Sequence, residues 1–346
     1  MKNTFSGLAL LFVLGLGLIA APLQAQKKGK KPSKPDYQAV IQDAYTKYKD
    51  VKEGKNADYI EELAKVDPNI FGIAIVTPDG KVFTVGNADV EVAIESVSKV
   101  FTMANNIERL GPDVVMEKIG VDATGLPFNS VMAVEINQGK EINPLVNPGA
   151  IMSVSMMAGA DSAEQWANIK KTLNAFAGRK LSINMPVYIS EANDNRHNEA
   201  LAVLLQSYGR MYSDPSEAND VYTKQCSMNV NAKDLATMAG TLANGGINPV
   251  TGEMVVSPET VAHVLAVMAT AGLYDDSGIW LFRTGLPAKS GVGGGLIAVV
   301  PGQFGIAVVS PPLDKAGNSV KGQLVIQYVV EALKVNPYLV QPVKKN

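Results

Sequence analysis

Strand-like segments stand in two groups, one early and one late in the chain, with a long, mostly helical stretch between them. The first group, 71–76 and 81–85, flanks Thr-Pro-Asp-Gly at 77–80, a pattern typical of a β-hairpin. The second group is a series of short apolar runs at 285–292, 296–300 and 304–309. The simplest packing joins both groups in one antiparallel sheet with helices on its faces. The sequence therefore predicts an α/β fold of the α+β type.

The stretch from about 112 to 270 is rich in Asn, Gly and Met, and its patterning is mostly helical. Helix starts are indicated by Asn231 with Asp234 and by Ser257-Pro258, and a last helix is expected at about 319–335. We expect this stretch to form a helical subdomain inserted between the two halves of the sheet. A cleft between sheet and subdomain is a typical place for a small-molecule site.

A serine and a lysine three positions apart follow the hairpin, in Glu-Ser-Val-Ser-Lys at 95–99. Apolar residues then recur at helical spacing as far as Leu110, and Gly111 stands where a helix ends. On the first turn of a helix, free N–H groups favour a developing anion next to Ser96. Lys99 shares its face and can take the hydroxyl proton if burial keeps the amine neutral. Alone, this pattern is common and more often marks a solvated helix start.

Lys289-Ser290-Gly291 lies in the late strand group. Serine acyl-enzymes with a Ser-x-x-Lys motif also use a Lys-Thr-Gly type of strand that faces the nucleophile. The strand lysine there supplies positive charge, and the small residues let the substrate lie close to the backbone. A third element is usually a Ser or Tyr between the two, and the sequence offers Ser227-Met228-Asn229 and Tyr222.

Over about residues 50–335 the sequence resembles the serine-dependent glutaminases, which share the fold of β-lactamases and penicillin-binding proteins. The chain looks like a secreted bacterial member of that family. The agreeing stretches are Ala-Asp-Tyr-Ile at 57–60, Ser-Val-Ser-Lys-Val-Phe-Thr at 96–102, Gly-Leu-Pro-Phe-Asn-Ser at 125–130, Asn-Pro-Leu-Val-Asn at 143–147, Ser-Glu at 190–191, Gln-Cys-Ser at 225–227, Leu-Ala-Asn-Gly-Gly at 242–246, Gly-Leu-Tyr-Asp at 272–275, Gly-Leu-Pro-Ala-Lys-Ser-Gly-Val at 285–292, Pro-Pro-Leu-Asp at 311–314 and Gly-Asn-Ser-Val at 317–320. Each match is weak alone, but their shared order is specific.

The resemblance implies catalytic roles for five positions. Ser96 is the expected nucleophile and Lys99 its base. The backbone N–H groups of Ser96 and Val292 are expected to form the oxyanion hole. Tyr222 and Tyr274 are expected beside the serine, where they relay protons to the leaving ammonia or to the incoming water.

The resemblance also implies a binding site for the amino-acid part of the substrate. Tyr59 is expected to close over the substrate, and Asn147, Glu191 and Asn198 to hold its head group. A free amino acid carries a carboxylate and an ammonium, so Glu191 suits the ammonium and the amide and phenol groups suit the carboxylate. Without the resemblance, the tyrosines are more simply packing residues, the asparagines turn residues and Glu191 a surface acid.

The sequence departs from the family pattern at three places near this site. Glu95 stands where the family usually has Gln, a residue expected to face the substrate's α-carboxylate. A carboxylate there repels the substrate unless Glu95 is protonated or turned away. Pro148 removes one backbone donor, and His197 replaces an arginine, with Arg196 one place early. These departures concern substrate preference and affinity rather than the serine–lysine pair.

Composition excludes several other classes of function. The formal net charge is −2, so there is no electrostatic case for nucleic-acid binding. The single cysteine, Cys226, excludes an internal disulfide framework and any multi-cysteine metal site. The two histidines, His197 and His263, leave few ligands for a metal and a poor supply for a Ser-His-Asp triad. We expect no cofactor and no metal.

The N-terminal residues resemble a secretory signal. Lys2 provides a positive start, 8–21 is a short apolar run, and a small-residue cleavage site ends at Ala25. We expect a signal peptide at 1–25, a basic linker at 26–45 and a catalytic domain at 46–346, exported to a bacterial periplasm without a stable membrane anchor. Helical patterning begins at Tyr37. The resemblance further implies a homodimer or homotetramer.

Three functional hypotheses follow from the sequence. The first is hydrolysis of L-glutamine to L-glutamate and ammonia through a glutamyl-serine ester. The second keeps the fold but changes the substrate, giving a β-lactamase, a cell-wall peptidase or another amidase. The third is a non-catalytic amino-acid-binding protein, against which the paired Ser96 and Lys99 argue because a binder needs no activated nucleophile.

Overall fold

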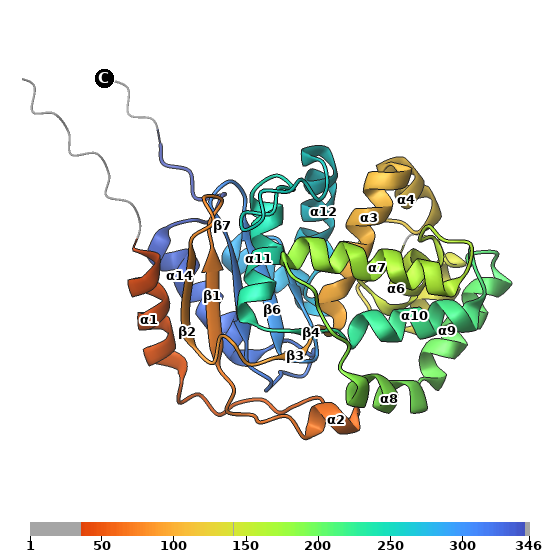
Figure 1. The fold of residues 1–346 in the computed structure, drawn as a ribbon, viewed down its shortest axis with the longest axis horizontal. Coiled ribbons are helices and arrows are strands. Elements are labelled where there is room, and N and C mark those ends of the chain that lie inside the picture. Colours follow the sequence, from red (N-terminus) through yellow and green to blue (C-terminus); the bar gives the residue numbers. More distant parts are fainter. Residues whose placement is uncertain (1–35, 141, 343–346) are drawn as a thin grey trace, which may run out of the picture. The chain divides into compact units, whose positions relative to one another are not determined.

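Both strand groups join in one five-stranded antiparallel sheet, in the order β2-β1-β7-β6-β5 (Figure 1). The computed structural model describes residues 36–140 and 142–342. The outer strand β2 forms the predicted hairpin with β1, and β1 pairs with β7 so that Gly72 lies opposite Val309. The strands of this sheet are β1 (Gly72–Val76), β2 (Val82–Gly86), β5 (Ala288–Ser290), β6 (Gly295–Val300) and β7 (Phe304–Val309). The predicted joining of the early and late strands is confirmed.

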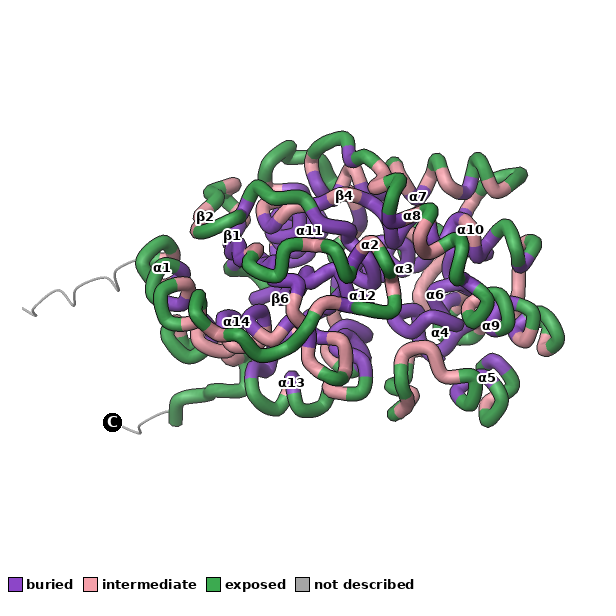
Figure 2. The backbone as a smooth tube through the Cα atoms, turned by 90° about the horizontal axis from the view of Figure 1, so that it is seen from below, coloured by how far each residue is buried: buried purple, intermediate pink, exposed green. Residues whose placement is uncertain are grey.

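Helices cover both faces of the sheet, which explains why its central strands read as continuous apolar runs. Ile73 and Ile75 of β1 point into one apolar cluster with α1 (Tyr37–Tyr48) and α14 (Val320–Leu333). Ala74 and Val76 point to the opposite face, into a second cluster that includes α11 (Ala232–Ala243). Figure 2 shows the resulting pattern, with β1, β6 and α3 (Lys99–Leu110) buried and the outer surfaces of α1 and α13 (Ser277–Thr284) exposed.

Helix α11 approaches β7 so closely that the two backbones touch. A Cβ atom added to Gly305 of β7 would lie 2.1 Å from the backbone nitrogen of Gly240 and 2.4 Å from the carbonyl carbon of Ala239. Glycine at position 305 is therefore required by the distance between helix and sheet rather than by its own dihedral angles.

We expect Gly305→Ala to lower the free energy of unfolding by roughly 1–3 kcal/mol, because the added methyl group has no space between β7 and α11. Gly278→Ala is the matched control, since the same methyl group at Gly278 in α13 meets nothing within 4 Å. Chemical denaturation of both variants measures the difference. Equal stability of the two variants would contradict this packing.

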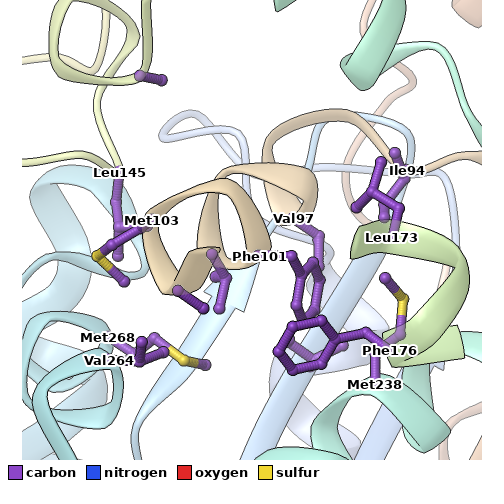
Figure 3. Packing of buried hydrophobic residues seen from close by; sticks show 14 of the residues in the cluster. Ile94, Val97, Phe101, Met103, Leu145, Leu173, Phe176, Met238, Val264 and Met268 are labelled. Atoms are coloured by element: carbon purple, nitrogen blue, oxygen red, sulfur yellow. The ribbon is translucent and has the colours of Figure 1, made fainter. Parts of the chain in front are cut away.

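Several of the other helices form a second body of structure beside the sheet. Figure 1 shows α6, α7, α9 and α10 gathered there, with α3 running between them and the sheet. Aromatic packing joins the layers: the rings of Phe101 in α3 and Phe176 in α7 have centroids 4.7 Å apart (Figure 3). The helices not yet named are α2 (Glu61–Ala64), α4 (Pro112–Lys118), α5 (Val131–Asn137), α6 (Asn147–Ser155), α7 (Ser162–Ala177), α8 (Met185–Asn193), α9 (Arg196–Ser207), α10 (Pro215–Cys226) and α12 (Pro258–Ala271).

The helical insertion is shorter than the predicted 112–270. Its last part includes α11, which covers the sheet instead, and α12, which packs against α3 and β5. The predicted helix starts are confirmed, because Asn231 and Asp234 form a reciprocal capping box and Ser257 caps α12. These local signals fix where a helix begins but not which layer it joins.

The folded part of the chain begins earlier than the predicted boundary at residue 46. Helix α1 starts at Tyr37, where the Asp36 carboxylate caps it, and Ile41 and Ala44 are fully buried against the sheet. Residues 37–45 therefore belong to the fold and not to a linker. The predicted signal peptide at 1–25 and the linker residues 26–35 lie outside the described residues. Within the described ranges, the helices are too short or too polar to span a bilayer.

Candidate active site

A short two-stranded ladder holds the Ser96 segment in place. β3 (Val92–Ala93) pairs with β4 (Asn229–Val230), and the N–H of Ile94 donates to the carbonyl of Met228 at 2.8 Å. The next residues form the one-turn 3₁₀ helix η1 (Glu95–Ser98), which leads directly into α3. The side chains of Ile94 and Val97 are buried in the core (Figure 3). These anchors fix the turn that carries Glu95 and Ser96.

The Lys-Ser-Gly strand lies directly against this turn. A Cβ atom added to Gly291 would lie 2.8 Å from the carbonyl oxygen of Ile94 and 3.3 Å from the backbone nitrogen of Ser96. Only glycine allows this approach of the two backbones. Val292 follows and lines the same cavity as Ser96, so the two predicted oxyanion-hole residues lie at one place.

Lys99 is buried one helical turn after Ser96, with 1% of its surface exposed. Its Nζ donates a hydrogen bond to Oδ1 of Asn147 at 2.7 Å, rather than to Ser96 as the motif alone suggests. Burial lowers the pKa of the Lys99 amine to about 8, although nearby Cys226, Glu95 and Glu191 oppose this shift. Near pH 8 about half of the amine is then neutral and able to accept a proton.

Asn147 connects Lys99 to a chain of polar side chains. Its Oδ1 also accepts from the Tyr222 hydroxyl at 3.1 Å, and its Nδ2 donates to Oδ1 of Asn198 at 3.0 Å. Asn198 donates in turn to Asn195 at 2.9 Å. Since both ends of the Asn147 amide form hydrogen bonds, this residue fixes the positions of Lys99 and Tyr222 relative to each other.

We expect Asn147→Asp to reduce activity at neutral pH by about 10- to 1000-fold, because each unit by which the pKa of Lys99 rises lowers the neutral fraction of the amine about tenfold. The shape of the side chain at position 147 changes little. A carboxylate 2.7 Å from the amine would raise the pKa of Lys99, and an opposite charge this close shifts a pKa by about 1–3 units. The acidic limb of the kcat profile should move to higher pH, so that part of the activity returns at alkaline pH. An unmoved limb would show that Lys99 does not set it.

Tyr274 also lies beside the nucleophile, in the 3₁₀ helix η2 (Tyr274–Asp276). Its φ of +56° is the left-handed region, which is strained for a bulky residue. The phenol donates to the carbonyl of Ser290 at 3.2 Å. Burial raises its pKa, while interactions with the Ser96 hydroxyl and with Ser290 oppose the rise. The neutral phenol is therefore placed to donate a proton beside Ser96.

Lys289 and Ser290 serve the site indirectly. Lys289 is fully buried, its Nζ donates to the carbonyl of Ser290 at 2.7 Å, and it lies 4.1 Å from the centre of the Tyr274 ring. Burial, together with Lys99, lowers the pKa of Lys289 well below its usual range. It thus supplies less positive charge than the motif predicts. The Ser290 hydroxyl donates to Asn318 at 2.6 Å and so supports the strand.

A cavity of about 610 Å³ opens above Ser96, a size typical of small-molecule sites. Tyr59, with 59% of its surface exposed, lies at the rim. The cavity brings together most of the predicted binding residues, namely Tyr59, Glu95, Ser96, Asn147, Glu191, Asn198, Tyr222 and Val292. Lys99 and Tyr274 lie behind this lining, through the contacts described above.

Glu95 and Glu191 face each other in this cavity. Glu95 is 3% exposed, and its φ of +51° is again in the left-handed region. Burial raises the pKa of Glu95 well above its usual range, and the charge of Glu191 adds to the rise. Burial also raises the pKa of Glu191, to about 7, against the opposing effects of Glu95 and Lys99. The pair therefore retains a proton under conditions where ordinary carboxyl groups are ionised.

The geometry and the motifs agree with the comparisons to known proteins. The glutaminase family model matches residues 54–338. The chain belongs to the glutaminase family. It is 50% identical to the glutaminase of Colwellia psychrerythraea over 89% of this chain and 99% of that protein. It is 54% identical to the glutaminase of Brucella canis over 82% of this chain and 90% of that protein.

Solved structures of glutaminases have the same fold. A probable glutaminase, YbaS, superimposes with a TM-score of 0.86 and 46% identity, over 88% of this chain and 98% of that one. Mglu in its glutamate form gives a TM-score of 0.82 and 35% identity, over 88% of this chain and 71% of that one. The predicted β-lactamase-like architecture is thereby confirmed.

Two departures from the glutaminase pattern have a clear structural context. Pro148 lies in the first turn of α6, where its missing N–H is one that a helix leaves unpaired in any case. His197 lines the cavity, and its Nε2 lies 2.7 Å from the carbonyl oxygen of Asn129. Arg196 opens α9 and is exposed. The position that changes the chemistry of the pocket is therefore Glu95.

Three residues near the site were not predicted as site residues from the sequence. Asn195 joins Asn198 to Thr223, to which its Nδ2 donates at 2.7 Å. Cys226 lines the cavity, and Phe128 packs its ring 4.8 Å from that of Tyr274. Phe128 and Cys226 lie inside family-like stretches, which was the available signal. Nothing in the periodicity of the chain marks Asn195.

Metal ligands do not gather in this part of the molecule or elsewhere in the described ranges. Within residues 36–140 and 142–342, no group of three or more His, Cys, Asp or Glu side chains is placed to hold a metal ion.

Proposed function

We propose that this chain is a glutaminase that hydrolyses L-glutamine to L-glutamate and ammonia through a covalent ester on Ser96. The observation that carries the proposal is the buried Lys99 amine one turn from Ser96, whose pKa is lowered to about 8. A neutral amine beside a hydroxyl is the arrangement that activates a serine nucleophile. Membership of the glutaminase family assigns the substrate.

In the first half-reaction, the Ser96 oxygen attacks the side-chain amide carbon of glutamine and loses its proton to Lys99. The backbone N–H groups of Ser96 and Val292 stabilise the oxyanion, each by about 3 kcal/mol. The carbon–nitrogen bond then breaks, and ammonia leaves with a proton supplied from Tyr222, Tyr274 or Lys99. The product is a glutamyl ester of Ser96.

In the second half-reaction, water enters the space that ammonia left and loses a proton to the same basic groups. It attacks the ester carbon, the bond to Ser96 breaks, and the serine oxygen recovers a proton. Glutamate is released and the starting state returns. Lys99 and Tyr222 both donate to Oδ1 of Asn147, so these two titratable groups exchange protons as a coupled pair.

The amino-acid head of the substrate lies between Tyr59, Glu191 and Asn198. The Glu191 carboxylate pairs with the α-ammonium, and Asn198 and Tyr59 contribute polar contacts at the rim. The similar protein Mglu has been solved in its glutamate form, which supports the fit of this amino acid to a fold of this kind.

Incubation with L-glutamine tests the proposal directly. We expect equal amounts of ammonia and glutamate, and no hydrolysis of a chromogenic cephalosporin. Hydrolysis of the cephalosporin without release of ammonia from glutamine would favour a β-lactamase-type activity. Tight calorimetric binding of glutamine without turnover would instead favour an amino-acid-binding protein.

The proposal extends to location and assembly. The charged start at Lys2, the apolar run at 8–21 and the cleavage signal ending at Ala25 support export to a bacterial periplasm. Mature protein from a periplasmic fraction should begin at Gln26, and an uncleaved cytoplasmic protein would contradict this.

Family resemblance supports a homodimer or homotetramer, which light scattering distinguishes from a monomer.

A further inference from the structure

Two acidic side chains meet in the cavity. Since Glu191 is proposed to pair with the α-ammonium, and the α-carboxylate is bonded to the same carbon, the second acid lies next to an anionic group of the bound substrate. Glu95 comes from η1 and Glu191 from α8, and both line the space above Ser96. One oxygen of each carboxyl group is buried without a hydrogen-bond partner among the described residues. A proton held between the two carboxyl groups would supply the missing donor.

The Glu95 side chain is confined to this position. A Cβ atom added to Gly291 would lie 3.2 Å from Cβ of Glu95, and one added to Gly293 would lie 3.2 Å from its Cγ. The turn between β5 and β6 therefore packs along the stem of the side chain. Together with its almost complete burial, this contact keeps the side chain at the cavity.

We propose that Glu95 binds the α-carboxylate of glutamine as a neutral carboxylic acid, donating the proton that it shares with Glu191. The proposal rests on the glutaminase function above and names the group that makes binding depend on pH. A neutral Glu95 can donate a hydrogen bond as an amide side chain does, whereas an ionised Glu95 repels the substrate. Above its own pKa of about 7, Glu191 is ionised and accepts from the α-ammonium.

The surroundings favour one proton on the pair. The groups that face Glu95 are Glu191 on α8, Lys99 on α3, Tyr222 and Cys226 on α10, Tyr59 at the rim and Tyr274 on η2. Lys99 is the cation among them, and its amine donates to Asn147. Two ionised carboxyl groups in contact repel each other, so one proton is retained, as in other carboxylate dyads.

The direction in which affinity for glutamine changes with pH follows from the protonation state of Glu95 that binds the substrate. Affinity is present while Glu95 is protonated and is lost as pH rises through its raised pKa. Above that pKa, affinity should fall about tenfold per pH unit. This loss appears in KM, whereas the ionisation of Lys99 appears in kcat, where activity rises with pH. The two effects are therefore separable in steady-state kinetics.

Calorimetric binding of L-glutamine to the full-length Ser96→Ala protein, with and without Glu95→Gln, tests the proposal between pH 7 and 9.5. We expect the affinity of the parent to fall with rising pH and its binding to take up a proton, as seen from buffers of different ionisation enthalpy. In the Glu95→Gln protein, both effects should shrink to what the substrate's own ammonium contributes. Parallel pH curves for the two proteins would overturn the proposal.

Glu61→Gln in the Ser96→Ala background is the matched control. Glu61 also lines the cavity, but it is exposed and paired with Lys65 at 2.8 Å. This change removes one acidic group without touching the pair, so the alkaline loss of affinity should remain. If Glu61→Gln abolished it, the effect would come from general charge and the proposal would be wrong. Absence of glutamine binding to Ser96→Ala at any pH would instead count against the glutaminase function itself.

Discussion

Ser96→Ala is expected to lower kcat for glutamine hydrolysis by at least about 10³-fold, since the change removes the only atom to which the glutamyl group is proposed to attach. The change is small in structural terms. The core anchors of the turn are Ile94 and Val97, and both remain in this variant. Thermal unfolding should therefore stay close to that of the parent, and glutamine should still bind.

Ser98→Ala is a matched control for this result. The Ser98 hydroxyl is fully buried and donates to the carbonyl of Glu95 at 2.6 Å, but it does not line the cavity. We expect this variant to lose stability rather than the chemical step. Ammonia release measured on both folded variants separates the two effects, and substantial turnover by Ser96→Ala would contradict the assignment of the nucleophile.

Replacement of Lys99 should have the second-largest effect. Lys99→Met keeps most of the volume and the apolar stem but removes the amine, and loss of a general base lowers kcat by about 10²- to 10⁴-fold. Because Lys99 is buried, exchange for an apolar side chain removes a desolvated amine, so the fold should survive. Circular dichroism and thermal unfolding check this.

Lys99→Arg distinguishes a base from a fixed positive charge. Arginine stays protonated at all relevant pH values, so it restores charge but not the ability to accept a proton. We expect Lys99→Arg to be as inactive as Lys99→Met at every pH. Recovery of activity by the arginine variant would show that the charge at position 99, not proton transfer, assists the reaction.

The sheet could be predicted from the sequence because its signals are local. The turn at 77–80 specifies the hairpin, and the glycine-bounded apolar runs specify the late strands. The layer that α11 joins could not be predicted, because its capping box marks a helix start without specifying a partner. That placement depends on Gly305 and Gly240, whose close contact joins residues far apart in the sequence.

In the candidate site, too, the features set by local spacing could be predicted and those set by tertiary packing could not. Ser96 in η1 and Lys99 at the start of α3 are three positions apart, so local spacing alone places Lys99 one turn after Ser96. The exchange of a Lys99–Ser96 hydrogen bond for one to Asn147 depends on tertiary packing. The weakened charge of Lys289 arises from complete burial, which a three-residue motif does not reveal.

The state of Glu95 could not be predicted from the sequence. A glutamate at this position suggests repulsion of the substrate's carboxylate. Whether it is ionised depends on Glu191 from α8 and on the glycine turn that packs against its side chain. Neither the positive φ nor the shared proton follows from the neighbouring residues. Both follow from three segments that meet only in the folded chain.

Mass spectrometry of the enzyme, quenched with acid during turnover, detects the covalent ester on Ser96 itself. We expect a glutamyl adduct on the peptide that contains Ser96, and no adduct on the same peptide of the Ser96→Ala variant. Rapid ammonia release with no adduct on Ser96, or with an adduct on another residue, would exclude Ser96 as the nucleophile.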